Sequence, residues 1–275
     1  MRRKLLCYEQ KDTWIDKLCG LSKLVFFLCW SITCMATYDT RILGIMFILS
    51  LIIFKISRIE WAQVGGVFKI ILFFLIVNVL AIYAFSPNEG SNIYGTTTVL
   101  LGTGRYALTA EQLFYECNII LKYFTIVPSI FIFIVTTNPS EFAASLNRIG
   151  ISYSIGYSVS IALRYIPDIQ DDFYKIRNAQ MARGIEMSDK AKPIARLKST
   201  ASIIFPLIFT SMGRIETIST AMELRSFGKN KKRTWYTARP LLRNDWIVIA
   251  GSVAFMAAAL VITFADGSRF YNPFI

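Results

Sequence analysis

Two arginines, Arg183 and Arg225, stand 42 residues apart in matching surroundings. Each arginine has an Ile seven positions before it, an Ala four positions before it and an apolar residue directly before it. A small residue follows each arginine directly, and an apolar residue comes next. Arginine keeps its charge and offers a planar set of donors that can bind a carboxylate through two hydrogen bonds. The repeat predicts two helices, each ending in an exposed arginine that binds a partner with two similar sockets. The plainer alternative is two helices that end in basic residues because these favour the negative end of the helix dipole.

The helix that leads to the first arginine is expected to begin after Pro167. Asp168, Asp171 and Asp172 follow the proline, and acidic residues favour the positive N-terminal end of a helix. Gly184 can end the helix in the left-handed conformation. An apolar stripe at helical spacing lies between these ends: Ile169, Phe173, Ile176 and Ala179.

The composition excludes most catalytic chemistry. The chain has 275 residues and no histidine, which excludes Ser-His-Asp and Cys-His relays and histidine-ligated zinc. Its five cysteines form no C-x-x-C pair, so we expect thiols that are buried or face lipid. The segment around Gly102 and Gly104 lacks the Lys-[Ser/Thr] of a Walker A loop. We therefore expect no catalytic residue, no metal site and no ATP hydrolysis by this chain alone.

The elements that must position the two arginines are predicted from hydrophobicity. Of the residues, 54% are hydrophobic and 17% charged, whereas an average soluble domain has about 25% charged residues. A run of about 20 apolar residues crosses a bilayer core about 30 Å thick. The stretch 24–54 is apolar except near Asp39, so we expect a tight helical hairpin that turns there. The predicted fold class is an all-α integral membrane protein with about five transmembrane helices, near 22–38, 42–57, 67–85, 113–135 and 245–264.

The distribution of basic residues predicts the orientation, because Lys and Arg are retained on the cytoplasmic side of short loops. The basic N-terminus is expected inside the plasma membrane and the C-terminus outside. Residues 137–245 hold 17 of the 30 Lys and Arg residues and nine Asp and Glu residues. We expect N-terminal membrane helices (1–136), a cytoplasmic or interfacial module that carries both arginines (137–244), and a last transmembrane helix with a short outer tail (245–275).

Two weaker apolar stretches, 152–167 and 200–212, lie within that module. If only the first crossed the membrane, 15 of the 30 basic residues would lie outside, against the charge rule. If both crossed, both would be short. We interpret them as cytoplasmic or interfacial helices. Within the first, Ser152, Gly156 and Ser160 form a small-residue stripe that lets another helix approach closely.

At these residues the sequence resembles the transmembrane (T) component of energy-coupling factor (ECF) transporters, the CbiQ/EcfT family of ABC-type vitamin and metal importers. The similarity includes Leu18–Leu24 before the first span and Ala162–Pro167. It is most specific at two motifs that look like the family's Ala-Arg-Gly motifs, the second with Leu for Ala and Ser for Gly. These motifs are Ala182, Arg183 and Gly184, and Leu224, Arg225 and Ser226.

The resemblance implies a non-catalytic scaffold and energy-transducing subunit of an ATP-driven importer. Arg183 and Arg225 would lie at the ends of coupling helices and dock into grooves of two ABC-type ATPase subunits, one each. ATP and Mg²⁺ would bind to those subunits, and ATP hydrolysis would move the coupling helices like scissors. A separate small membrane S component would bind the vitamin or metal ion and would topple or leave to deliver it. Residues expected to support the coupling helices are Arg164, Pro167, Ala179, Ala221 and Gly228.

Two other classes of function remain open from the residues. In an integral membrane enzyme that acts on a lipid phosphate, Asp168, Asp171 and Asp172 could hold Mg²⁺. In a stand-alone secondary transporter, the intramembrane residues Glu116 and Lys122 would couple the ion gradient. Their spacing of six does not place them as a pair on one helix face, and no inverted repeat is visible in the sequence.

The densest basic cluster, Lys229–Arg233, precedes the last predicted span. We interpret it as an anchor to anionic lipid headgroups and expect no nucleic-acid partner. Trp235, Tyr236 and Trp246 fit an aromatic belt at the membrane interface.

Overall fold

The computed structural model describes residues 13–102, 104, 106–185, 193–229, 235, 239–265 and 268–274. The chain divides into two compact units. The first unit contains Met1–Asn138 and Arg239–Ile275, and the second unit contains Pro139–Ala238. Within the described ranges the strands are limited to one small hairpin, β1 (Val99–Leu101) with β2 (Leu108–Thr109). The predicted all-α class is confirmed.

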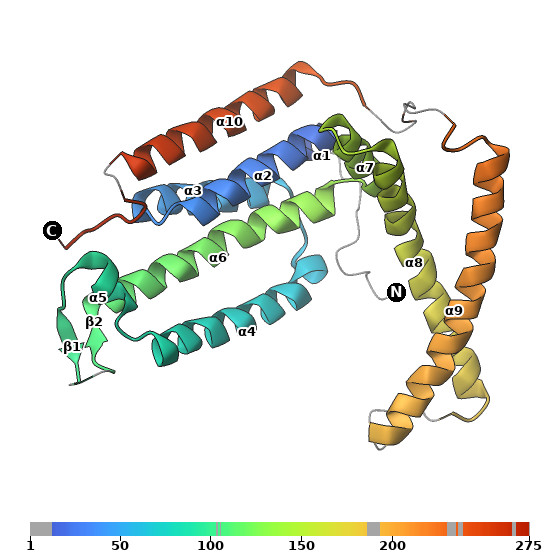
Figure 1. Cartoon of the computed structure of the whole chain (residues 1–275), viewed down its shortest axis with the longest axis horizontal. Coiled ribbons are helices and arrows are strands. Elements are labelled where there is room, and N and C mark those ends of the chain that lie inside the picture. Colours follow the sequence, from blue (N-terminus) through green and yellow to red (C-terminus); the bar gives the residue numbers. More distant parts are fainter. Residues whose placement is uncertain are drawn as a thin grey trace. The chain divides into compact units, whose positions relative to one another are not determined.

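The first unit is a bundle of long helices that run side by side (Figure 1). The short helices α1 (Trp14–Lys17) and α5 (Glu89–Tyr94) accompany them. Half of the most apolar stretch of α6 is buried, against 6% for α4 and 11% for α10, so α6 is the central helix of the unit. The long helices are α2 (Gly20–Ala36), α3 (Thr40–Ile56), α4 (Trp61–Phe85), α6 (Ala110–Thr136) and α10 (Arg243–Phe264).

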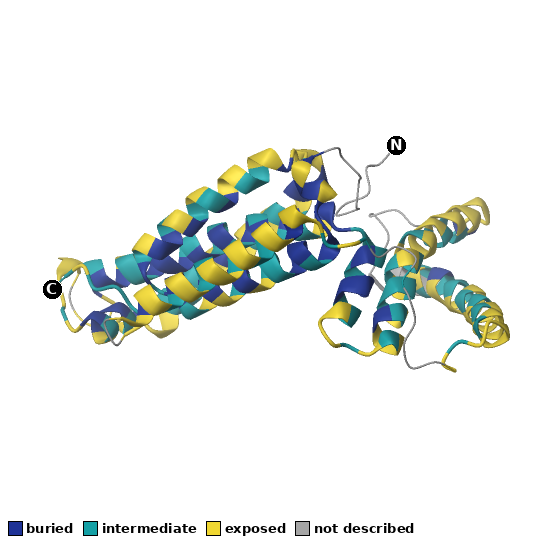
Figure 2. Ribbon diagram, turned by 90° about the horizontal axis from the view of Figure 1, so that it is seen from above, coloured by how far each residue is buried: buried dark blue, intermediate teal, exposed yellow. Residues whose placement is uncertain are grey.

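Four described helices are long and apolar enough to cross a membrane: α4, α6, α10 and the Ser199–Leu224 part of α9. The apolar helix α2 has 17 residues, which corresponds to about 26 Å at 1.5 Å per residue. Exposed residues follow the outer faces of the helices in the bundle (Figure 2), and many exposed side chains of α4 and α10 are large and apolar, as expected where a helix faces lipid. The chain is an integral membrane protein. The number and direction of its crossings stay predictions.

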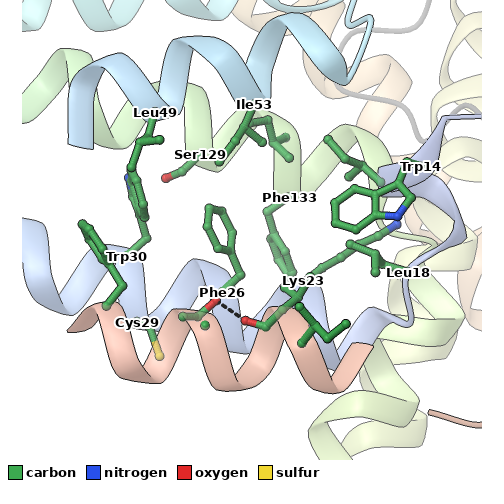
Figure 3. Close-up of a pocket in the computed structure, with 17 residues that line it drawn as sticks. Trp14, Leu18, Lys23, Phe26, Cys29, Trp30, Leu49, Ile53, Ser129 and Phe133 are labelled. Carbon is green, nitrogen blue, oxygen red and sulfur yellow. Dashed lines mark hydrogen bonds between the residues drawn. The ribbon is translucent and has the colours of Figure 1, made fainter. Parts of the chain in front are cut away.

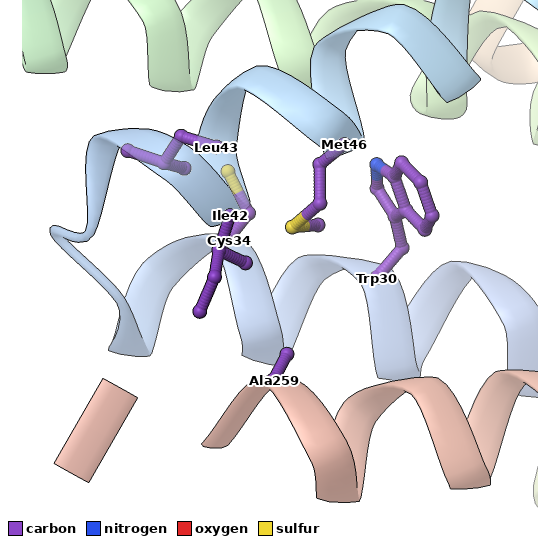
Figure 4. Close-up of a cluster of buried hydrophobic side chains, with 6 residues drawn as sticks. All are labelled: Trp30, Cys34, Ile42, Leu43, Met46 and Ala259. Atoms are coloured by element: carbon purple, nitrogen blue, oxygen red, sulfur yellow. The ribbon is translucent and has the colours of Figure 1, made fainter. Parts of the chain in front are cut away.

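The hairpin turn predicted at Asp39 is confirmed. Asp39 is the N-cap of α3, and its carboxylate accepts a hydrogen bond from the Arg41 backbone N–H at 2.9 Å. An N-cap carboxylate satisfies a backbone donor that the first helical turn leaves unpaired. Behind the turn, α2, α3 and α10 bury a shared apolar cluster (Figure 4), which fixes the hairpin against the rest of the bundle. The cluster consists of Trp30, Cys34, Ile42, Leu43, Met46 and Ala259.

A buried carboxylate joins the beginnings of α2 and α10. Asp245 accepts hydrogen bonds from the Cys19 backbone N–H at 2.7 Å, the Ser22 hydroxyl at 2.8 Å and the Leu242 backbone N–H at 2.9 Å. Its side chain is almost fully buried, and hydrogen bonds to an ionised group are stronger than those between neutral groups. Asp245 therefore holds the beginnings of α2 and α10 together at one end of the bundle.

The neighbouring Lys23 connects the same end of α2 to α6. Its Nζ donates to the Thr136 carbonyl oxygen, in the last turn of α6, at 2.6 Å. A cation at this position also favours the negative end of the helix dipole. The segment Leu18–Leu24, part of the family resemblance, thus ties α2, α6 and α10 together.

The second unit contains α7 (Pro139–Arg148), α8 (Tyr153–Ala182) and α9 (Pro193–Leu224). Helices α8 and α9 run in opposite directions and cross (Figure 1). Near the end of α8, Gln180 Nε2 donates to the Ser202 carbonyl oxygen in α9 at 3.1 Å. Near its beginning, the Tyr157 ring lies 4.6 Å from the Phe227 ring just after α9.

The prediction that a helix begins after Pro167 is wrong, because α8 begins at Tyr153 and continues through the proline. Ser152 caps it by accepting a hydrogen bond from the Ile155 backbone N–H at 3.5 Å. Proline removes one hydrogen bond inside a helix, but the other bonds of this 30-residue helix remain, and α8 is packed on both α7 and α9. The acidic residues after Pro167 therefore lie in mid-helix.

The two weaker apolar stretches are also longer elements than expected. Residues 152–167 form the first half of α8, and residues 200–212 lie inside α9. The sequence predicts only the apolar part of each helix, because hydrophobicity ends there while the helix continues into polar sequence. Their interfacial placement stays a prediction.

Candidate functional site

Helix α8 ends in a tight left-handed turn at the first arginine. The Arg183 backbone N–H donates to the Ala179 carbonyl at 3.2 Å, and the Ile185 N–H reaches back to the Gln180 carbonyl at 3.1 Å. Gly184 between them has φ of 83°. This is the Schellman ending, in which one left-handed residue lets the chain cap the last helical carbonyls. The left-handed conformation predicted for Gly184 is confirmed.

Helix α9 ends in the same way at the second arginine. The Arg225 backbone N–H donates to the Ala221 carbonyl at 3.2 Å, and the Phe227 N–H donates to the Met222 carbonyl at 2.9 Å. Ser226, the residue after the arginine, has φ of 53°. A left-handed residue with a Cβ atom costs about 1 to 2 kcal/mol. The sequence repeat is therefore also a repeat of backbone geometry, retained even where serine replaces glycine.

Both endings present their motif residues at the surface of the second unit. The side chain of Leu224 is 82% exposed, and an exposed large apolar side chain beside a cation suits a contact with a protein partner. Each ending can offer a guanidinium for a carboxylate together with a small or apolar neighbour. The exposed motif residues are Ala182, Arg183, Gly184, Leu224, Arg225 and Ser226.

Aromatic side chains anchor the second ending to α7 and α8. The Phe227 ring lies 4.6 Å from the Tyr157 ring and 5.8 Å from the Tyr153 ring. Trp235 packs 5.2 Å from Tyr153 and donates from Nε1 to Asn147 Oδ1 at 3.3 Å. Aromatic pairs contribute about 0.5 to 1.5 kcal/mol beyond their burial. The residue two positions after the second arginine is thus held in place, by contacts that sequence analysis did not foresee.

The three positions of the small-residue stripe differ in their surroundings. A Cβ atom on Gly156 would lie 3.1 Å from the Ala143 carbonyl oxygen and 3.4 Å from the Trp235 ring, so glycine allows α7 to approach α8 closely. Ser152 caps α8, and Ser160 is half-buried.

The other predicted supporting residues lie along α8 and α9 and their ends. Ala179 and Ala221 are exposed and act through backbone carbonyls that accept from the motif arginines. Arg164 is exposed and Pro167 half-buried, both inside α8. Gly228 has φ of 88°, a conformation that glycine adopts without strain.

The predicted basic anchor, 229–233, is described only at Lys229, which is exposed. Its other residues and Tyr236 lie outside the described residues. Trp246 is 59% exposed near the beginning of α10, as an interfacial tryptophan would be. The anchor and the aromatic belt stay predictions.

An ion pair that sequence analysis missed joins α8 to α9. The Arg214 guanidinium donates to the Asp172 carboxylate at 2.6 Å, and the two side chains are 33% and 19% exposed. Arg214 also lies 5.8 Å from the ring centroid of Tyr165. The two partners are 42 residues apart, the same offset that relates the motif arginines. Applying that offset to the acidic residues of α8 would have found the pair.

The acidic residues considered for a metal site do not form one. Asp172 pairs with Arg214, whereas Asp168 and Asp171 are exposed. Among the described residues, no group of three Cys, Asp or Glu side chains gathers so that it could hold a metal ion.

The two charged residues of α6 that are predicted to lie within the membrane have separate partners. Glu116 accepts a hydrogen bond from Gln112 Nε2 at 3.1 Å. Lys122 Nζ donates to the Met35 carbonyl at 3.3 Å and lies 3.1 Å from the Tyr38 ring centroid, where the ring's negative face attracts a cation. Both charges are buried and act as contacts within the bundle.

The first unit contains a cavity of about 320 Å³ between its helices (Figure 3). Its walls are mainly apolar, with Phe26, Trp30 and Phe133 among them. Of the described residues that line it, Lys23 carries a charge, and its Nζ bonds the Thr136 carbonyl.

Comparison with known proteins places these features in a family. Residues 11–236 match the model of the CbiQ family, described as cobalt transport protein. The chain belongs to the CbiQ family. The matched residues include α2 to α9 and both arginine endings, and the resemblance to the T component of ECF transporters is confirmed.

Named relatives of this CbiQ-family chain agree. The energy-coupling factor transporter transmembrane protein EcfT of Leuconostoc gelidum subsp. gasicomitatum is 24% identical over 91% of this chain and 93% of its own. The EcfT of Macrococcus caseolyticus is 28% identical, with 77% of this chain and 79% of its own covered. A Bifidobacterium longum protein named as an ABC transporter ATP-binding protein is 23% identical over 90% of this chain, which corresponds to 32% of that protein.

Proposed function

We propose that this CbiQ-family chain is the membrane scaffold and energy-transducing subunit of an ECF-type ABC importer. Its two arginine endings would each dock on one ABC-type ATPase subunit, in a homodimer or heterodimer. The observation that carries the proposal is the pair of equivalent Schellman endings that expose Arg183 and Arg225. Two like endings on one chain fit two like sockets.

The names of the relatives support ATPase partners. The EcfT proteins are named as the transmembrane proteins of a transporter. In the Bifidobacterium longum protein, a segment similar to this chain covers about a third of a polypeptide named as ATP-binding. A chain of this kind would therefore work next to an ABC ATPase. ATP and Mg²⁺ would bind to the ATPase subunits, and this chain would supply no catalytic residue.

The chemistry of docking follows from the exposed guanidinium groups. Each can pair with a carboxylate in an ATPase groove, and losing one buried charge contact at an interface costs about 2 to 5 kcal/mol. Motion of the ATPases would then be transmitted along α8 and α9. The second unit and the N-terminus would face the cytoplasm and the C-terminus the outside.

The transported substrate would bind to a separate small membrane S component. The chain would support that component with apolar helix faces, and α9 exposes a row of large apolar side chains that could contact it or lipid. These are Phe205, Ile208, Phe209, Met212 and Ile215. The substrate class would be a vitamin or a metal ion, chosen by the S component.

Substitution of both motif arginines tests this function. Arg183→Glu with Arg225→Glu should remove the ATPase subunits from the purified complex and abolish uptake, while the chain still inserts in the membrane. Lys55→Glu makes the change of charge of one of these substitutions at an exposed lysine of α3 and should leave both ATPase binding and uptake unchanged. Uptake and ATPase retention at wild-type levels in the double variant would refute the proposal.

A further inference from the structure

The ion pair between α8 and α9 occupies a special place in the repeat. Residues 42 positions apart are equivalent in the two helices, as the matching arginine endings show. Asp172 and Arg214 are equivalent to each other by this offset, and they also contact each other at 2.6 Å. In two antiparallel helices related by a local twofold axis, a residue that contacts its own equivalent lies at that axis.

The shared offset also sets the spacing from the pair to the motif arginines. Eleven residues separate Asp172 from Arg183, and eleven separate Arg214 from Arg225. At 1.5 Å per residue, each arginine ending lies about 16 Å along its helix from the ion pair. Because Asp172 and Arg214 also contact each other, the pair marks a point of contact between α8 and α9 that is equally far from both endings.

We propose that Asp172 and Arg214 are positioning residues that form the pivot of α8 and α9 and thereby set the separation of Arg183 and Arg225. This inference rests on the proposed function, in which those arginines dock on two ATPase subunits. The two helices turn about the pair, and the charge contact keeps them together at the crossing while their ends move.

The surroundings of the pair suit a pivot. The contact joins two ionised, partly buried side chains, so it is stronger than a neutral hydrogen bond. Its attraction depends mainly on the distance between the charges and so resists separation of the helices more than rotation.

The chain offers a matched control. Lys175 also approaches Asp172, at 3.6 Å, but it lies on the same helix and its side chain is 77% exposed. A surface pair of this kind contributes little. Removing the Lys175 charge therefore changes the surroundings of Asp172 without affecting the contact between helices.

The test measures the distance between the two helix ends in the assembled transporter. Spin labels are placed, on unnatural amino acids, at Asn178 and Thr220, which are exposed and each lie five residues before a motif arginine. Double electron–electron resonance then measures the distance between the two labels. We expect one main distance in the otherwise unchanged chain. Asp172→Asn should shift the ratio of alternative separations roughly tenfold, because the acceptor loses its charge and only a weaker, neutral hydrogen bond to Arg214 can remain. It should also lower transport per ATP hydrolysed while the ATPases stay bound.

The remaining variants separate a pivot from a general loss of stability. Lys175→Gln should leave both the distances and the coupling unchanged. The exchanged pair Asp172→Arg with Arg214→Asp should restore both, because the two positions are equivalent. Unchanged distances and coupling in Asp172→Asn, with ATPases bound, would overturn the pivot. Absence of ATPases even from the unsubstituted complex would instead overturn the proposed function.

Discussion

The residue after each motif arginine is in the left-handed conformation, and it is Gly184 in one ending and Ser226 in the other. Exchanging glycine and serine at these positions should therefore change the stability of the two endings in opposite directions. Gly184 has φ of 83° and Ser226 has φ of 53°. A Cβ atom on Gly184 would have no described atom within 4 Å, so a side chain there meets no clash and costs only backbone strain. Gly184→Ser should therefore destabilise the first ending by about 1 kcal/mol, which is about a fivefold change in its ordered population.

Ser226→Gly should act in the other direction. It relieves the strain of a left-handed serine but gives the unfolded chain more conformational freedom, so the second ending should become more stable by only about 0.5 kcal/mol. Hydrogen–deuterium exchange at the amides of Ile185 and Phe227, which close the two Schellman endings, measures both effects. Exchange should become about fivefold faster at Ile185 in the first variant and slower at Phe227 in the second. If Gly184→Ser leaves Ile185 exchange unchanged, the two endings do not share the backbone geometry on which the repeat depends.

Two further substitutions test the packing that positions the site. Asp245→Asn should lower the free energy of unfolding by about 2 to 3 kcal/mol, because the amide can accept the two hydrogen bonds at one oxygen but places an NH2 donor against the Leu242 N–H and removes the charge. Thermal unfolding in detergent measures this, and an unchanged melting temperature would show that the carboxylate is dispensable. Gly156→Val should lower the free energy of unfolding by about 1 to 3 kcal/mol, because the larger side chain overpacks against α7. Gly213→Val should cause no such overpacking, because a Cβ atom at Gly213 meets open space among the described residues. Equal melting temperatures for the two valine variants would contradict the close approach of α7 and α8.

Local signals in the sequence predicted much of the architecture. Asp39 is a polar break in a long apolar run and also a good N-cap, so the hairpin turn was evident. The arginine endings were evident because the left-handed turn after a helix favours a small residue, which both motifs contain. These features depend on neighbours within a few residues.

Features that depend on distant residues were not predicted. Pro167 and the aspartates after it look like a helix start, but packing on α7 and α9 keeps α8 continuous through them. The contacts of Asp172 with Arg214 and of Trp235 with Tyr153 join residues 42 or more positions apart. A local sequence pattern does not predict contacts between such distant residues. The offset of 42 in the arginine repeat does match the separation of Asp172 and Arg214.

The most direct test of the proposed function is the composition of the complex purified through this chain. Native mass spectrometry after affinity purification in mild detergent should find one copy of the chain with two ABC-type ATPase subunits and a small hydrophobic membrane protein. The same purification of the chain with Arg183→Glu and Arg225→Glu should lose the ATPases and retain the small membrane protein. Purification of the unsubstituted chain without ATPases, or full retention of them by the double variant, would contradict the account.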